Sequence, residues 1–234
     1  KLGKDLDRSD RKGERFSLMA RVALGQSKMV VRPVSGLLHI IVYVGFIIIN
    51  IEVLEIVIDG ITGKHRVFAF LGGFYKFLIS AFEGLALLVL LACVVFLIRR
   101  NVLRIKRFFG KEMTSWPKTD ANLILITEIL LMSAFLIMNA TDSILQTRGV
   151  EHYTQVGDFP ISRHLMGLFD GMSSDSLVML ERGTWWFHIL GIFVFLNYLP
   201  YSKHFHILLA FPNVFYSKLE PKGQLNNMEA VKKE

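Results

Sequence analysis

Three histidines in long apolar stretches stand out as residues that could carry chemistry. His188 and His206 are 18 residues apart, near the two ends of the apolar segment 185–212. In one regular helix this spacing corresponds to five turns, so both imidazoles share a face about 27 Å apart along the axis, while His204 faces elsewhere. His39 lies in an earlier apolar stretch. Imidazoles on the inner face of a membrane helix typically hold a metal, most often haem iron.

The composition is that of a membrane protein. Of the 234 residues, 52% are hydrophobic and 20% are charged, and the mean hydropathy is +0.43. These values predict an all-α integral membrane bundle of about four transmembrane helices plus surface helices, with a fifth helix expected upstream of this chain. The net charge of +7 comes from basic residues beside apolar segments, with no separate basic patch interleaved with aromatic residues. Nucleic acid is therefore not an expected partner, whereas membrane lipid is.

The chain divides into three parts. Residues 1–33 form a basic cytoplasmic arm with an interfacial helix, residues 34–216 form the transmembrane bundle, and residues 217–234 form a polar cytoplasmic tail. Thr119 and Asp120 are expected to cap the start of the third span. Two surface pieces are expected around residues 162–172 and 176–180. The four spans are expected at residues 34–58, within 68–98, at 121–145 and at 185–212.

The distribution of basic residues predicts the orientation of the chain. Most of the 27 lysines and arginines lie in the N-terminal arm, in the connector 99–118 and from Lys203 onward. By the positive-inside rule these regions, and therefore both ends of the chain, are cytoplasmic. His39 and His206 then lie at one depth on antiparallel helices, the arrangement that clamps a haem between two imidazoles. The alternative for each histidine is a packed or interfacial side chain. The single cysteine, Cys93, excludes a cysteine-ligated iron–sulfur cluster within this chain.

Polar residues within the spans suggest a second type of chemistry. Glu83 and Glu128 lie deep in the second and third spans, and Asn50 and Glu52 lie in the outer half of the first. Such groups can accept the protons that a quinol releases on oxidation, so we expect a quinone site among them. The alternative is that Glu52, with Glu55 and Asp59, pairs or is solvated at the interface. The connector that carries His65 and Arg66 is expected to be a solvated loop.

A family resemblance adds to this interpretation. The segment PYSKHFHI, with a histidine 18 residues before the last one, resembles the gamma subunit of respiratory nitrate reductase and the membrane subunit of heterodisulfide reductase. It is most similar to bacterial proteins in which such a membrane region precedes a cysteine-rich iron–sulfur oxidoreductase domain. SGLLHIIVYVGF, WPKTDANLIL and the final NVFY are similar in style, and the resemblance covers most of residues 20–216.

The resemblance implies specific ligands and partners. It implies that His206 and His39 are the axial ligands of a cytoplasmic-side haem b, and that His188 is a ligand of a second, outer haem. In the family's two-haem pattern a second histidine follows the first by ten residues, and here Ile49 occupies that position. An aliphatic side chain cannot coordinate iron, so one haem is expected, with two possible only if His152 or His164 supplies a ligand.

The resemblance also implies an electron-transfer function. The chain would be the membrane part of a quinone-linked oxidoreductase in a bacterial inner membrane. It would pass electrons between quinone and a cytoplasmic iron–sulfur subunit or domain, toward which the tail leads. Two other classes stay open from the residues alone: a membrane protein that conducts protons or other ions through its intramembrane acids, and a non-catalytic membrane anchor.

Overall fold

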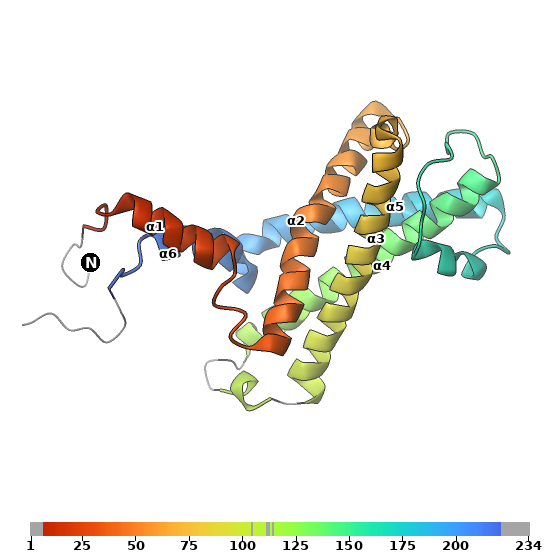
Figure 1. Cartoon of the computed structure of the whole chain (residues 1–234). Coiled ribbons are helices and arrows are strands. Elements are labelled where there is room, and N and C mark those ends of the chain that lie inside the picture. Colours follow the sequence, from red (N-terminus) through yellow and green to blue (C-terminus); the bar gives the residue numbers. More distant parts are fainter. Residues whose placement is uncertain (1–6, 104, 111–112, 114, 221–234) are drawn as a thin grey trace, which may run out of the picture.

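The computed structural model describes residues 7–103, 105–110, 113 and 115–220, and these residues contain helices and turns but no strand. The predicted all-α fold class is confirmed. Residues 1–6 of the predicted arm and 221–234 of the predicted tail lie outside the described residues. The α-helices are α1 (Lys12–Met19), α2 (Pro33–Thr62), α3 (Gly73–Leu97), α4 (Trp116–Thr147), α5 (Ser174–Tyr198) and α6 (His206–Phe215) (Figure 1).

Within the described part of the chain, four helical segments are long and apolar enough to cross a membrane. Each has at least 28 residues, which at 1.5 Å per residue exceeds the roughly 30 Å of a bilayer's hydrocarbon core. The fourth segment begins at Ser174, well before the predicted residue 185. The piece 176–180, expected on the surface, is part of the first turns of α5. The four segments are Pro33–Thr62, Gly73–Val102, Trp116–Thr147 and Ser174–Tyr201.

Local sequence signals explain where these helices begin and end. Pro33 stands at the first position of α2, where its missing N–H would have no helical partner anyway. Gly63 ends the same helix with a φ of 68°, and its N–H donates to the Asp59 carbonyl at 2.8 Å. Ser173 caps α5 by accepting a hydrogen bond from the Ser176 N–H.

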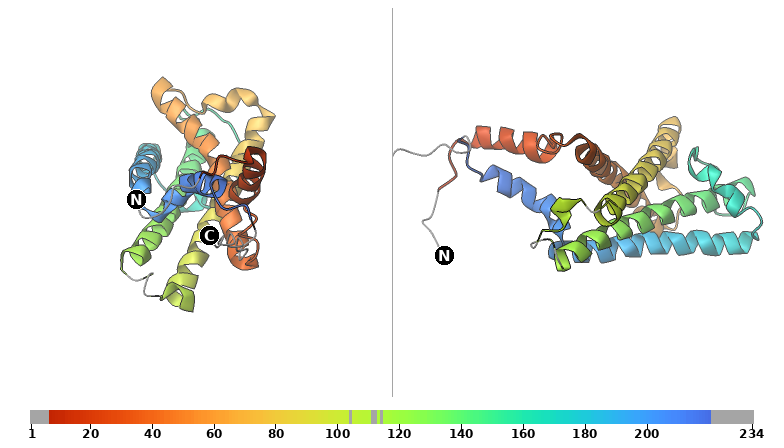
Figure 2. Two further views of the ribbon diagram at one scale, coloured as in Figure 1. Left: turned by 90° about the vertical axis from the view of Figure 1, so that its left-hand side faces the viewer. Right: turned by 90° about the horizontal axis from the view of Figure 1, so that it is seen from below.

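The four long helices form two crossed hairpins. α2 and α3 run antiparallel, as do α4 and α5, and α3 packs on α4 to join the hairpins (Figure 1). The shorter helices α1 and α6 pack against each other beside the bundle (Figure 2). Arg15 ties them together, since its buried guanidinium donates to the Phe215 and Ser217 carbonyls, each at 2.9 Å. α1 lies in the N-terminal arm where an interfacial helix is expected, and its position at a membrane surface stays a prediction.

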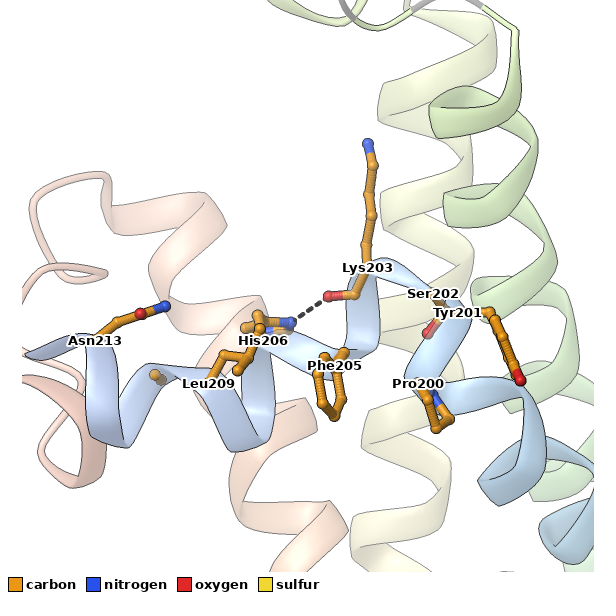
Figure 3. A pocket seen from close by; sticks show the side chains of 9 residues that line it. Pro200, Tyr201, Ser202, Lys203, Phe205, His206, Leu209 and Asn213 are labelled. Atoms are coloured by element: carbon orange, nitrogen blue, oxygen red, sulfur yellow. Dashed lines mark hydrogen bonds between the residues drawn. The ribbon is translucent and has the colours of Figure 1, made fainter. Parts of the chain in front are cut away.

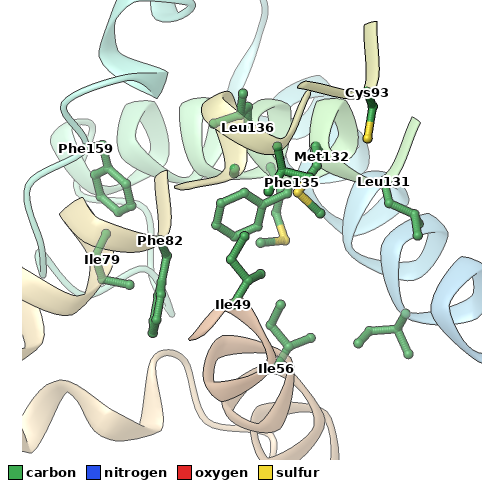
Figure 4. Close-up of a cluster of buried hydrophobic side chains, with 14 of the residues drawn as sticks. Ile49, Ile56, Ile79, Phe82, Cys93, Leu131, Met132, Phe135, Leu136 and Phe159 are labelled. Carbon is green, nitrogen blue, oxygen red and sulfur yellow. The ribbon is translucent and has the colours of Figure 1, made fainter. Parts of the chain in front are cut away.

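One apolar cluster fills the space where the hairpins cross (Figure 4). Phe82 and Ile79 of α3 lie in it with Phe135 of α4, all at most 2% exposed. The helices approach closely at Gly45, where an added Cβ would lie 2.4 Å from the Val89 Cγ2. A larger residue there would require the Val89 side chain or the helix to shift. Cys93 is buried in the same cluster.

Candidate functional site

The structure brings His39, His204 and His206 together beside the bundle. The ring centres of His39 and His206 are 6.4 Å apart, and those of His204 and His206 are 5.8 Å apart. His39 comes from the second turn of α2, whereas His204 lies in the segment that links α5 to α6 and His206 is the first residue of α6. Residues from the two ends of the bundle sequence thus form one cluster of imidazoles.

The predicted single helix over residues 185–212 is wrong. α5 ends at Tyr198, two short 3-10 turns follow at Leu199–Tyr201 and Lys203–Phe205, and α6 begins at His206. Pro200 has no N–H to continue the helix, and Ser202 is extended, with φ −105° and ψ 166°. His188 and His206 therefore do not share one helical face, in spite of their 18-residue spacing. His39 and His206 are nevertheless adjacent.

Asp120 of α4 holds this break in place. The prediction that it caps the start of α4 is wrong, because the helix begins at Trp116 and Asp120 lies inside it, 1% exposed. Its Oδ2 accepts the Lys203 N–H at 2.9 Å, and its Oδ1 accepts a hydrogen bond from the Tyr198 hydroxyl. Ser202 adds a cap, since its Oγ accepts the His204 N–H at 3.1 Å. The stretch that carries His204 and His206, which we name the histidine segment, is therefore anchored to α4 on both sides of the break.

The hydrogen bonds of the cluster leave imidazole nitrogens free for a ligand. His206 Nδ1 lies 2.8 Å from the Lys203 carbonyl (Figure 3), and because a carbonyl only accepts, Nδ1 carries the proton. The lone pair is then on Nε2, the usual state of a metal-ligating histidine. Burial, with a smaller effect from neighbouring His206, lowers the pKa of His204 to about 4, so this ring is neutral at pH 7. His39 Nδ1 is buried and has no hydrogen-bond partner among the described residues.

Two cavities adjoin the histidines. One of about 390 Å³ contains His206 and lies along the link between α5 and α6 (Figure 3). The other, of about 280 Å³, is shared by His39 and His204 and lies among α2, α3 and α4. We name it the inner cavity, and it is lined by Met29, Ser35, His39, Phe96, Arg99, Arg100, Phe108, Ala121, Ile124, Leu125 and His204.

The donors that are present fit a two-ligand haem site. With metal–nitrogen bonds of about 2 Å, two imidazoles on opposite sides of one metal ion have ring centres roughly 6 Å apart. The 6.4 Å between His39 and His206 agrees with this spacing. Within the described part of the chain, no three His, Cys, Asp or Glu residues are grouped to hold a metal by themselves. Ligation by His39 and His206 stays a prediction, and His204 is placed to compete for either role.

His188 lies apart from this cluster, in the core of the bundle. Its side chain is 1% exposed, its Nδ1 lies 3.0 Å from the Leu131 carbonyl, and its ring centre is 5.9 Å from that of Phe135. Ile49, which replaces the histidine of the two-haem pattern, is buried in the apolar cluster. α2 therefore offers packing at that position and no second ligand for His188.

Glu83 is fully buried, and both of its carboxylate oxygens accept hydrogen bonds. Oε1 accepts from the Asn139 amide at 3.2 Å, and Oε2 accepts from the N–H groups of Ile161 and Ser162 at 2.8 and 3.2 Å. It thereby fastens the connector after α4 to the bundle. Short 3-10 turns at Ser162–His164 and Met166–Leu168 occupy the piece expected on the surface, and Ser162 is itself buried.

The other residues predicted for a quinone site lie in different surroundings. Asn50 is exposed and its amide binds the Phe46 carbonyl of its own helix. Glu128 is half-buried on α4. Glu52, by contrast, is 1% exposed, with Oε1 bound to Arg66 at 3.0 Å and Oε2 buried without a hydrogen-bond partner among the described residues. The structure therefore does not gather these four candidates around one cavity.

Arg66 is the polar residue that the sequence reasoning missed. The connector was expected to be solvated, yet Arg66 is 7% exposed, and its guanidinium donates to Glu52, to Asn139 at 2.7 Å and to Asp142 at 2.8 Å. His65 is also drawn in, since its Nε2 lies 3.0 Å from Asp142 Oδ1 and its side chain is 7% exposed. We name Arg66, Glu52, Asn139, Asp142 and His65 the outer polar cluster.

The spacing of acids on α2 was the signal for this cluster. Glu52, Glu55 and Asp59 follow one another by three and four residues, so all three carboxylates lie on one face of the helix. Asp59 accepts the backbone N–H groups of Arg66 and Val67, at 2.8 and 2.9 Å. A row of acids facing the interior requires a cation or N–H donors opposite it, and the connector supplies both.

Two curated proteins are similar to almost the whole chain. The probable iron-sulfur-binding oxidoreductase FadF of Bacillus subtilis (strain 168) is 26% identical over 232 residues, which cover 98% of this chain and 30% of that protein. The EtfAB:quinone oxidoreductase of Syntrophomonas wolfei subsp. wolfei (strain DSM 2245B / Goettingen) is 23% identical over 227 residues, which cover 94% and 30%. This chain thus spans about 30% of the length of these relatives. No family model and no solved structure matches it.

Proposed function

We propose that this chain is the haem b-binding membrane region of a quinone-linked iron–sulfur oxidoreductase. His39 and His206 would hold the iron from opposite sides, and the haem would supply one-electron chemistry between the two-electron quinone and an iron–sulfur partner. The observation that carries the proposal is the pair of imidazoles 6.4 Å apart, with the His206 Nδ1 proton bound to the Lys203 carbonyl and the His39 Nδ1 buried without a partner.

The relatives support the partners in this proposal. One is described as iron–sulfur-binding and the other as a quinone oxidoreductase, and in both the similarity covers one region of a longer protein. For this chain we infer a membrane quinone as one redox partner and an iron–sulfur subunit or domain as the other. Both relatives are bacterial, and four helices here are long enough to span, so we assign the chain to a bacterial inner membrane.

The histidine cluster is assigned to the cytoplasmic side. The inner ends of α2, α3 and α4 carry Arg32, Arg99 and Lys118, and Lys203 follows α5. By the positive-inside rule this end of the bundle faces the cytoplasm. Both ends of the described chain lie on the same side. An iron–sulfur partner on that side would then lie close to the haem.

The quinone is assigned to the opposite half of the bundle. His188 donates its Nδ1 proton to the Leu131 carbonyl, which leaves Nε2 as an acceptor. Buried carboxylates accept protons from a quinol as it is oxidised, and Glu52 Oε2 is such an acceptor without a partner. Glu83 is the deeper carboxylate proposed to carry protons in this half. Glu128 lies in the inner half, since α4 begins at the inner end with Trp116, and it is proposed as a further proton carrier there.

A second candidate function is proton conduction. The buried acid face of α2 and the unpartnered Glu52 Oε2 favour it, because intramembrane acids commonly mark proton paths. At the inner end of α2 the sequence from Pro33 to His39 contains no acid, so the row of acids in the outer half of this helix does not continue to the inner side. We therefore prefer the electron-transfer function.

A redox spectrum of the purified chain tests the proposal. The chain is expressed with haem supply, purified in detergent, and reduced first with a short-chain quinol and then with dithionite. We expect the absorption bands of low-spin haem b, with part of the signal developed by quinol alone. A chain that is folded by circular dichroism but shows no haem b signal with either reductant would contradict the proposal and leave proton conduction as the function to test.

A further inference from the structure

Arg100 is a buried cation at the inner end of α3 whose donors are not all used. Its side chain lies in the bundle, 7% exposed, with Nη2 donating to the Pro117 carbonyl at 3.3 Å. The guanidinium stacks over the Phe108 ring at 5.2 Å. Its Nε is buried and has no hydrogen-bond partner among the described residues. A buried guanidinium left with a free donor is costly unless something pairs with it.

No acid in the described part of the chain forms an ion pair with Arg100. Asp120 is the acidic group that acts on it electrostatically, but the two Asp120 oxygens bind the Tyr198 hydroxyl and the Lys203 N–H. Asp120 is thus committed to the break after α5. The free donor of Arg100 therefore points to an anion that does not come from these residues.

The inner cavity lies next to this unpaired donor. Arg100 and Arg99 both line it, and the Arg99 Nη2 donates to the Ser35 hydroxyl at 3.4 Å. The remaining wall is largely apolar, with Phe96, Ile124 and Leu125, and His39 closes the same cavity. A cavity with two guanidinium groups and a hydroxyl in a mostly apolar wall suits an amphipathic molecule with an anionic group.

We propose that Arg100, with Arg99 and Ser35, binds a propionate carboxylate of the haem held at His39. This inference rests on the proposed function and adds positioning residues to it. Guanidinium forks bind carboxylates through two parallel hydrogen bonds, which a lysine at the same place could not form. The pairing would orient the macrocycle and would hold a positive charge next to it.

The same cavity chemistry would also accept the phosphate of an anionic lipid. The lining favours the haem carboxylate, because His39 shares the cavity with the two arginines and its own Nδ1 is unpartnered. A lipid would satisfy Arg100 and leave that imidazole without a role. The two anions are distinguished by removing the carboxylate from the haem and by removing the anionic lipid from the membrane.

The test measures the haem midpoint potential and haem content in nanodiscs of phosphatidylcholine, which has no net charge. Arg100→Gln is compared with Arg32→Gln, a change of the same type at an exposed residue at the start of α2. We expect Arg100→Gln to shift the potential downward, because the lost cation no longer stabilises the reduced haem, and Arg32→Gln to leave it unchanged. If Arg100→Gln is poorly expressed, Arg100→Lys and Arg99→Gln are measured, and each should give a smaller downward shift.

A second arm uses haem dimethyl ester, in which both carboxylates are blocked. Wild-type chain should retain the ester less well than haem b, and Arg100→Gln should retain the two equally. Equal potentials for Arg100→Gln and Arg32→Gln, or the same preference for haem b in wild type and Arg100→Gln, would overturn the propionate assignment. A potential shift that appears only with anionic lipid would assign the site to a lipid phosphate instead. A wild-type chain without haem b would remove the proposed function itself, a result distinct from either of these.

Discussion

Replacing Arg66 by alanine tests whether the outer polar cluster holds the two hairpins together. Its guanidinium joins Glu52 of α2 to Asn139 and Asp142 of α4, through hydrogen bonds of 2.7 to 3.2 Å. Burial acts to lower the pKa of Arg66, but attraction from the surrounding carboxylates, Asp142 and Glu52 among them, outweighs burial and raises it, so the group stays charged. The alanine variant leaves two buried carboxylates without their cation.

The expected loss is large for a single substitution. Each hydrogen bond to a charged partner contributes about 1.5–3 kcal/mol, but the contributions do not add because the abandoned acids can take up protons. Breaking a buried ion pair by removing one partner costs about 3–5 kcal/mol, and we expect Arg66→Ala to fall in that range. The free energy of unfolding is measured by SDS titration in mixed micelles, followed by circular dichroism.

Lys64→Ala is the matched control in the same connector. Lys64 is exposed, so its removal should change the unfolding free energy by no more than about 0.5 kcal/mol. If Arg66→Ala is as stable as Lys64→Ala, the cluster does not carry the stability that its geometry implies. That result would return the connector to the solvated loop expected from the sequence.

Three further changes probe other parts of the molecule. Asp120→Ala removes the acceptor of the Lys203 N–H and should lower haem content severalfold by releasing the histidine segment, whereas Asn122→Ala on the same helix should not; equal haem content in both would contradict the anchoring role. Glu83→Gln should raise hydrogen exchange at Ile161 and Ser162, measured by mass spectrometry, because a neutral amide is a weaker acceptor; unchanged protection would argue against it. His188→Ala should keep full haem content but slow quinol-driven haem reduction severalfold in stopped flow, and loss of half the haem would instead reveal a second haem.

The sequence was sufficient for the spans whose apolar runs are continuous. α2, α3 and α4 overlap the predicted segments because an apolar run of this length with few charged residues is typical of a membrane span. The fourth span was misplaced because its first turns are polar. Glu181 in those turns is 3% exposed, and it pairs with Arg182 beside it and accepts the Tyr153 hydroxyl of the preceding connector at 2.8 Å. Hydropathy measures each residue alone and does not register such pairing.

The candidate site was only partly predictable for the same reason. The apolar environment and the basic flanks of His39 and His206 suggested a common depth, and the two rings are adjacent in the structure. Whether Pro200 bends a helix or ends it depends on what receives the freed N–H groups, and here the Asp120 carboxylate does so from another helix. Arg66 was misjudged because Lys64 and His65, which precede it, are polar, whereas its partners come from α2 and α4.

Haem content of single histidine variants tests the central claim most directly. His39→Ala, His206→Ala and His204→Ala are purified in parallel, and haem b per chain is measured by the pyridine haemochrome method, with folding checked by circular dichroism. The account predicts one haem per wild-type chain, its loss in His39→Ala and His206→Ala, and its retention in His204→Ala. Full haem in His206→Ala together with loss in His204→Ala would show that the inner cavity pair, His39 and His204, holds the iron. Full haem in His39→Ala would contradict the site altogether.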